Sequence, residues 1–200
     1  MSSAIQPCEL PPTALLQRCR DQGAYTDCYV TTVAGVVSAP AFIEAFYTTT
    51  LFKLERLILR WAVGKTSTDR DAQALASGDC DHFAAWRVEA RASGQLLLAD
   101  FTGRTKSWLM VETVGAAADA NKSASGTSDL RNADSLDVSP IKTLLYFGSA
   151  VVPRGGNESD RRRGMGLLFH ALLGFHQLYS RCLLRSARSR LLAQAARPSR

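Results

Sequence analysis

The sequence predicts one α+β domain in which an antiparallel sheet packs against a long C-terminal helix. Two hundred residues with 46% hydrophobic content are enough to fill one sizeable core. Between residues 82 and 114, apolar and polar side chains alternate in short runs separated by turn residues, which is typical of antiparallel strands. Residues 164–180 contain no Asp, Glu, Lys or Arg and carry apolar side chains at helical spacing. These two patterns, in this order, indicate the fold class.

The first third of the chain predicts a strand followed by two short helices. Residues 1–22 form an N-terminal approach segment. Residues 25–33 are rich in β-branched and aromatic side chains and predict the first strand. Pro40 fits the first turn of a helix, and a second helix is expected over residues 50–64, where a glycine ends it. Residues 66–80 leave room for a further strand that the pattern does not resolve.

Three strands are expected in the middle of the chain, over residues 82–90, 95–101 and 104–114. Ser93-Gly94 and Thr102-Gly103 supply the tight turns between them. Short strands joined by such turns pair with their neighbours in sequence, so we expect an antiparallel meander.

The last strand and the closing helix are separated from this meander by a long insertion. Residues 115–140 are rich in Ala, Ser, Asn and Asp and contain no aromatic residue, so they are expected to be flexible and without function. Residues 141–152 predict the last strand. The long helix is expected to start near Ser159 or Asp160, because an acid there complements the helix dipole.

Positive charge is concentrated at the C-terminal end. Residues 161–200 carry nine arginines and no acidic residue, whereas residues 1–160 hold 15 basic and 18 acidic residues. Because most of the chain is slightly acidic, we expect no nucleic-acid partner. The domain is expected to span residues 23–190, followed by a basic tail at residues 191–200.

Cysteine usage indicates the compartment. The five cysteines are odd in number and scattered, and none forms a CxxC pair. This pattern favours a reducing, cytoplasmic location and argues against structural zinc. We expect neither a metal site nor a cofactor. The N-terminus also lacks the basic-then-apolar pattern of a signal peptide.

In its order of a strand, two helices, several antiparallel strands and a long helix, the chain resembles the START / polyketide-cyclase (SRPBCC) superfamily, as a bacterial branch of it, over residues 23–190. This resemblance implies a helix-grip fold, in which a curved antiparallel sheet wraps around the C-terminal helix. It also implies an apolar cavity between sheet and helix, closed at one end by the two short helices, and a small hydrophobic ligand. Only some members of the superfamily are catalytic.

The sequence contains no Gly-x-Ser-x-Gly elbow, P-loop, dinucleotide fingerprint or HExxH motif. Each of the three histidines, His82, His170 and His176, is interpreted first as a structural imidazole bonded to the backbone. His170 is the functional candidate, because a C-terminal helix that lines a cavity would hold its titratable imidazole in an apolar cleft. Asp100 is the second catalytic candidate.

The candidates for ligand binding are large or polar side chains near the expected cavity. Mid-strand aromatic residues are usually core, but in a helix-grip fold the concave face of the sheet is also the cavity wall. Arg104, beside the turn that contains Asp100, is placed either to pair with that acid or to hold a ligand carboxylate. The expected ligand-binding residues are Trp86, Arg104, Trp108, Tyr146, His170 and Gln177.

Three functions remain open at this point. The first is binding of a small hydrophobic molecule in the cavity, with no assigned activity. The second is an enzyme of cyclase or dehydratase type that uses His170 with Asp100 or Tyr146. The third, which we rank lower, is peripheral association with an anionic membrane surface through the arginine-flanked helix, which is too short to cross a bilayer. The sequence leaves the oligomeric state open.

Overall fold

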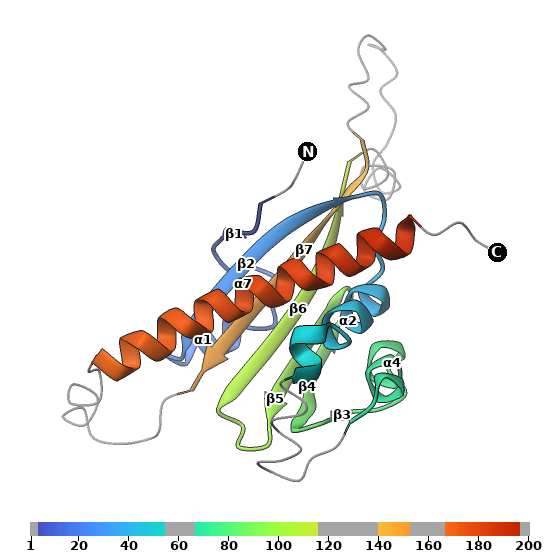
Figure 1. Cartoon of the computed structure of the whole chain (residues 1–200). Helices are drawn as coiled ribbons and strands as arrows, with labels where there is room; N and C mark the ends of the chain where they lie inside the picture. Colours follow the sequence, from blue (N-terminus) through green and yellow to red (C-terminus); the bar gives the residue numbers. More distant parts are fainter. Residues whose placement is uncertain (1–3, 55–66, 116–139, 153–166, 197–200) are drawn as a thin grey trace, which may run out of the picture.

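The computed structural model describes residues 4–54, 67–115, 140–152 and 167–196, with side chains of the last segment from His176 onward. Within these residues, seven strands form one open antiparallel sheet in the order β1-β2-β7-β6-β5-β4-β3 (Figure 1). The strands are β1 (Gln6–Pro7), β2 (Tyr25–Ala34), β3 (His82–Phe83), β4 (Trp86–Ala92), β5 (Gln95–Asp100), β6 (Thr105–Val114) and β7 (Lys142–Val151). The helices are α1 (Gln17–Asp21), α2 (Ala39–Tyr47), α4 (Asp69–Ser77) and α7 (Leu167–Ala195). The predicted class, α+β with an antiparallel sheet and a long C-terminal helix, is confirmed.

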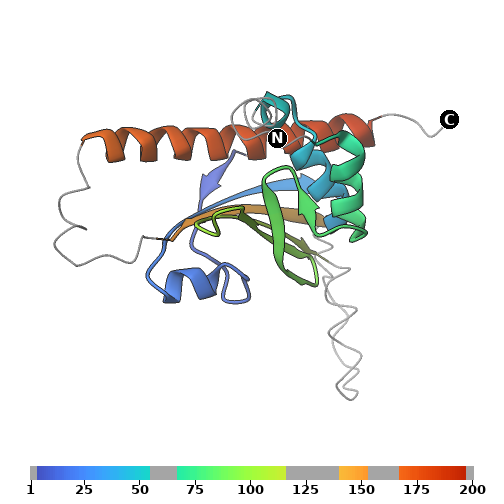
Figure 2. The ribbon, with the colours of Figure 1, turned by 90° about the horizontal axis from the view of Figure 1, so that it is seen from below.

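The two faces of the sheet are covered by different parts of the chain. Helices α2, α4 and α7 lie on one face, and α1 with the rest of residues 8–24 lies on the other (Figure 2). Helix α7 contacts β2, β7 and α2. The first turns of α7 project beyond the ends of the strands in both views (Figures 1 and 2).

The core beneath the helices, which we call the first core, contains a cluster of aromatic side chains. Phe46 of α2 packs against Tyr47, Phe52 and Phe147, with ring centroids 5.2, 6.4 and 4.8 Å away, respectively. The C-terminal half of α7 closes this core with one apolar face, formed by Leu183, Leu184, Ala187 and Leu191. Along this half of α7, side chains therefore fill the space between helix and sheet.

A second core lies on the opposite face, under the N-terminal segment. Trp108 is fully buried there, and its Nε1 donates to Oε1 of Gln95 at 2.9 Å. Gln95 also holds the segment, because its Oε1 accepts from the backbone N of Leu15 and its Nε2 donates to the backbone O of Thr13, both at 3.0 Å. The buried members are Leu10, Ala14, Leu16, Cys19, Cys28, Leu97, Trp108, Met110, Tyr146 and Ala150. The residues that the sequence set apart as an approach segment thus supply part of a core.

Local sequence explains where the short helices begin. Ser38 Oγ accepts from the backbone N of Ala41 at 3.3 Å, and Pro40 occupies the first turn of α2. Helix α4 starts with a reciprocal capping box between Thr68 and Asp71. This box lies in the stretch that was left open for a further strand, and the structure has a helix there.

Most of the predicted strands are confirmed, with one correction. The strand expected over residues 82–90 is a short hairpin, in which β3 and β4 pair antiparallel around a turn at Ala84 with a φ of 53°. Alanine gives no turn signal in sequence, so the alternating pattern concealed this turn. Nearly all of the predicted insertion at residues 115–140, and the expected helix start at Ser159 or Asp160, lie outside the described residues.

Gly148 of β7 is expected to tolerate no side chain. A Cβ there would lie 2.9 Å from the backbone O of Asp27, 3.0 Å from the Trp108 ring and 3.1 Å from the Leu16 side chain. We therefore expect Gly148→Ala to lower the free energy of unfolding by about 1–3 kcal/mol, because the second core has to shift to admit the methyl group. Urea denaturation measures this change, and an unaltered midpoint would show that this core is loosely packed.

Candidate functional site

Three polar side chains meet where α7 crosses the sheet. Asp27 of β2 and Ser149 of β7 are opposite each other in the strand register, so their side chains share the face that α7 covers. The backbone N and Oγ of Ser149 both donate to Oδ1 of Asp27, at 3.1 and 2.5 Å. His176 of α7 places Nε2 2.7 Å from the same Oγ. We call these three residues the polar cluster.

The second carboxylate oxygen of Asp27 is the unusual atom of this cluster. Its Oδ2 is buried and has no hydrogen-bond partner among the described residues. The nearest cation-forming group is His176, whose Nε2 lies 3.7 Å from Oδ2. The Asp27 side chain is 7% exposed and that of His176 is 30% exposed, so the imidazole lies on the solvent side of the carboxylate. A buried oxygen of this kind is unfavourable unless another donor reaches it.

Further polar contacts between α7 and β2 surround the polar cluster. Gln177 Nε2 donates to the Tyr25 hydroxyl at 3.2 Å. The Arg181 guanidinium lies 5.3 Å from the centre of the Tyr29 ring. Burial, aided by the charge of Asp27, raises the pKa of Tyr29 to about 12.

The hydrogen-bond arrangement differs from that of a serine hydrolase. In such enzymes the carboxylate bonds to one imidazole nitrogen and the serine to the other, so that the imidazole removes the serine proton. Here Asp27 bonds directly to Ser149, and His176 presents the same nitrogen to both residues. With the Ser149 hydroxyl donating to Asp27, its oxygen accepts from His176. The polar cluster is therefore built to hold hydrogen-bond partners rather than to activate a nucleophile.

Two of the expected ligand-binding aromatics lie far from this site in the fold. Trp108 and Tyr146 belong to the second core, on the sheet face opposite α7. The Tyr146 hydroxyl donates to Glu112 Oε2 at 3.1 Å. Neither side chain therefore contributes to a wall between sheet and C-terminal helix. Trp86 lies on the helix-covered face, partly buried, and its Nε1 has no partner among the described residues.

The remaining candidates are distributed between a turn and α7. Asp100 Oδ1 accepts from the backbone N of Arg104 at 2.8 Å and from the Thr102 hydroxyl at 2.9 Å, so this carboxylate shapes the β5–β6 turn. Gln177 lies beside the polar cluster. His170 lies on α7, and its side chain is outside the described residues.

Sequence reasoning did not select Asp27, Ser149 or His176 as site candidates. A signal for Asp27 was present, because an acid at this position of β2 shares a face with Tyr25 and Tyr29 and therefore points inward. Ser149 gave no such signal, since a small hydroxyl in a strand is ordinary. His176 was interpreted as structural because nothing in the sequence shows which strand residues it meets.

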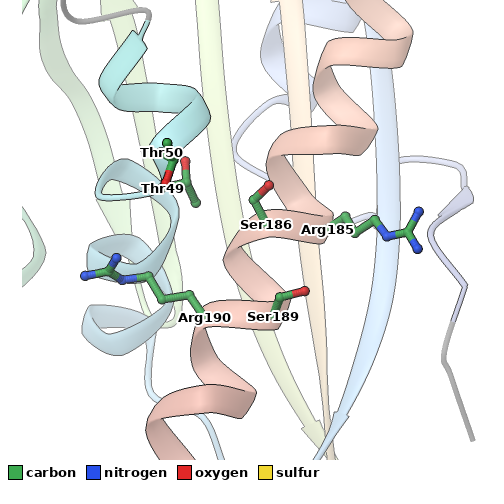
Figure 3. Close-up of a pocket in the computed structure, with 6 residues that line it drawn as sticks. All are labelled: Thr49, Thr50, Arg185, Ser186, Ser189 and Arg190. Atoms are coloured by element: carbon green, nitrogen blue, oxygen red, sulfur yellow. The ribbon is translucent and has the colours of Figure 1, made fainter.

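An open pocket of about 410 Å³ lies between α7 and the chain that follows α2 (Figure 3). It is lined by Thr49, Thr50, Arg185, Ser186, Ser189 and Arg190. Figure 3 shows the two arginine side chains pointing in opposite directions, and Arg190 Nη1 donates to the backbone O of Thr48 at 3.3 Å. The guanidinium groups thus do not converge on a common anion, and every lining residue is of a polar or charged type.

Comparisons with known proteins do not assign the site. No family model, curated protein or solved structure matches the chain significantly. In the described part of the chain, no three His, Cys, Asp or Glu side chains are grouped to hold a metal ion. None of the helices described combines the length and the hydropathy that crossing a bilayer requires.

Proposed function

We propose that this protein binds a small amphipathic molecule between the sheet and helix α7, in the manner of a helix-grip protein. The polar end of the ligand meets Asp27, Ser149 and His176, and its apolar end extends along residues 167–175 of α7. The observation that carries this proposal is the buried Asp27 Oδ2, which has no hydrogen-bond partner among the described residues.

The free lone pairs of Asp27 define the chemistry of the polar end. Oδ1 already accepts two hydrogen bonds from Ser149, so Oδ2 is the atom left for a ligand. A carboxylate oxygen accepts and never donates, so the ligand must offer an N–H or O–H group. An amine or a hydroxyl satisfies this requirement, whereas a ligand carboxylate would repel Asp27.

The packing of α7 indicates where the apolar end lies. From Leu183 onward the helix is packed against the first core, which leaves no room for a ligand there. The residues of α7 that precede His176 project past the strands (Figure 2) and are apolar in sequence except for His170. An apolar chain attached to the bound head group would therefore lie along residues 167–175.

The test compares head groups on ligands with one tail. For the wild-type protein, we expect octylamine or octanol to bind at least about 10-fold more tightly than octanoate, because a hydrogen bond to a charged group contributes about 1.5–3 kcal/mol. Isothermal titration calorimetry gives the three affinities. Native mass spectrometry of protein purified from cells, with extraction of anything it carries, identifies a resident ligand.

Asp27→Asn is the decisive variant, because the amide can still accept from Ser149 while an N–H₂ group replaces Oδ2. We expect this variant to lose the preference for the amine or alcohol. Glu112→Gln removes one negative charge on the opposite face and serves as the matched control. A folded Asp27→Asn protein with the wild-type order of affinities would refute the proposal, as would wild-type protein that binds none of the three ligands.

Acid–base catalysis at the same site is a second candidate. It is favoured by the position of His176, whose Nε2 is close to both Ser149 and Asp27 and partly open to solvent. In this case the imidazole of His176, rather than that of His170, transfers the proton. The test incubates an extracted ligand with wild-type protein and with the His176→Gln variant. If His176 is catalytic, only the wild-type protein converts the ligand into a product.

A further inference from the structure

Two cysteines from distant parts of the sequence lie side by side at the edge of the sheet. In the β1–β2 pairing, Gln6 is opposite Val30 and Pro7 is opposite Tyr29, so the next opposed pair is Cys8 and Cys28. The backbone N of Cys8 donates to the backbone O of Cys28 at 3.0 Å. The two sulfur atoms are 3.3 Å apart.

Strand pairing gives these cysteines a geometry that suits a disulfide. Directly opposed residues of antiparallel strands have Cα atoms about 4.5–5.5 Å apart. Disulfides join Cα atoms that are about 4.4–6.8 Å apart. Rotation of the two side chains is therefore enough to bring the sulfur atoms into bonding distance, and the backbone stays in place.

The two thiols differ in accessibility and in acidity. Cys8 is partly exposed, whereas Cys28 is 5% exposed and belongs to the second core. The Cys28 thiol can donate to a Cys8 thiolate, which lowers the pKa of Cys8, while the same contact and burial raise the pKa of Cys28. Cys8 thus has the properties of a thiol that meets an oxidant first, and Cys28 is placed to resolve the product because its sulfur lies 3.3 Å from that of Cys8.

We propose that Cys8 and Cys28 form a reversible thiol–disulfide site whose oxidant is hydrogen peroxide. The Cys8 thiolate attacks one peroxide oxygen, the O–O bond breaks, and Cys8 sulfenic acid forms as the other oxygen leaves as water after protonation. The Cys28 sulfur then attacks the Cys8 sulfur, the S–OH bond breaks and a second water leaves. Both sulfurs are oxidised by one electron each, and the peroxide is reduced to two molecules of water.

The disulfide would anchor residues 8–28, which pack over the second core. The chain between Cys8 and Cys28 contains α1 and supplies Leu10, Ala14 and Leu16 to that core. Its noncovalent ties to the sheet include the Gln95 contacts to Leu15 and Thr13. The disulfide closes this stretch into a loop, so conformations in which the segment detaches from the sheet become much less populated. The site is on the face opposite the polar cluster and does not depend on ligand binding there.

Peptide mapping tests the chemistry directly. Reduced full-length protein is treated with hydrogen peroxide, free thiols are alkylated, and a non-reducing tryptic digest is analysed by mass spectrometry. Trypsin cuts after Arg18, Arg20 and Lys53, so the expected product joins residues 1–18 to residues 21–53. Cys19 is released separately in this digest, and the exposed Cys182 serves as an internal comparison.

The expected result is a Cys8–Cys28 link that forms before Cys182 is oxidised and disappears on treatment with dithiothreitol. Cys8→Ser and Cys28→Ser each abolish it, and Cys19→Ser leaves it unchanged. Full alkylation of Cys8 and Cys28 under conditions that oxidise Cys182 would overturn the proposal.

Hydrogen exchange tests whether the disulfide reduces opening of the segment over the second core. With a loop of this length, amide exchange in residues 13–24 is expected to slow by about 100-fold in the oxidised protein. Peroxide-treated Cys8→Ser protein should show no such slowing. Disulfide-linked protein with unchanged amide exchange would contradict the proposal that the bond anchors this segment.

Discussion

Replacing Trp108 by alanine is expected to lower the free energy of unfolding by about 3–5 kcal/mol. The indole is fully buried in the second core, its ring centroid lies 6.3 Å from that of Tyr146, and its Nε1 donates to Gln95. Removing it leaves a cavity and also frees the glutamine that ties the N-terminal segment to the sheet. Urea denaturation followed by circular dichroism measures the loss, which corresponds to a fall in Tm of about 6–20 °C.

Trp108→Phe separates the two contributions. Phenylalanine keeps most of the buried area but cannot donate to Gln95, so we expect this variant to lose only about 1–2 kcal/mol. Trp108 was also a candidate for a ligand-contacting residue in a cavity wall. A loss below about 1 kcal/mol for Trp108→Ala would favour that earlier interpretation over a packed core.

The second large effect is expected at Leu184 of α7. This side chain is fully buried among the aromatic residues of the first core. We expect Leu184→Ala to reduce the free energy of unfolding by about 2–5 kcal/mol, because the fixed aromatic neighbours cannot close around the void. Leu192, on the same helix and 40% exposed, provides the matched control, and its alanine variant should change stability by at most about 0.5 kcal/mol.

The Leu184→Ala and Leu192→Ala variants also separate stability from ligand binding. The proposed ligand lies at the opposite end of α7, so folded Leu184→Ala protein should bind octylamine as the wild type does. Equal stability losses at Leu184 and Leu192 would show that the C-terminal half of α7 does not pack as described. A selective loss of affinity in Leu184→Ala would instead move the ligand toward the first core.

Local patterns determined much of this fold in advance. Short apolar runs between turn residues over 95–114 and the β-branched run at residues 25–33 predicted β5, β6 and β2, because both signals lie within single stretches of neighbouring residues. Pro40 predicted the start of α2 for an equally local reason. The sequence missed the turn at Ala84 and the helix α4, since the first lacks a turn residue and the second depends on a short capping box.

The candidate site could not be predicted in the same way. Asp27 lies 122 residues before Ser149, and His176 follows Ser149 by 27 residues, on a different element; Ser149 and His176 are ordinary in their local context. Their meeting depends on β2 pairing with β7 and on the position at which α7 crosses both strands. The same is true of Cys8 and Cys28, which only the register of β1 brings together.

The sequence by itself therefore determined the class of fold and the order of most of its elements, because these follow from side-chain patterns along single segments. The tertiary structure alone decided that residues 8–24 close a second core, that Trp108 and Tyr146 lie there, and that a buried carboxylate meets a serine and an imidazole under α7. Those outcomes depend on strand register and helix placement. Both are set by the sum of many distant contacts, which no local pattern records.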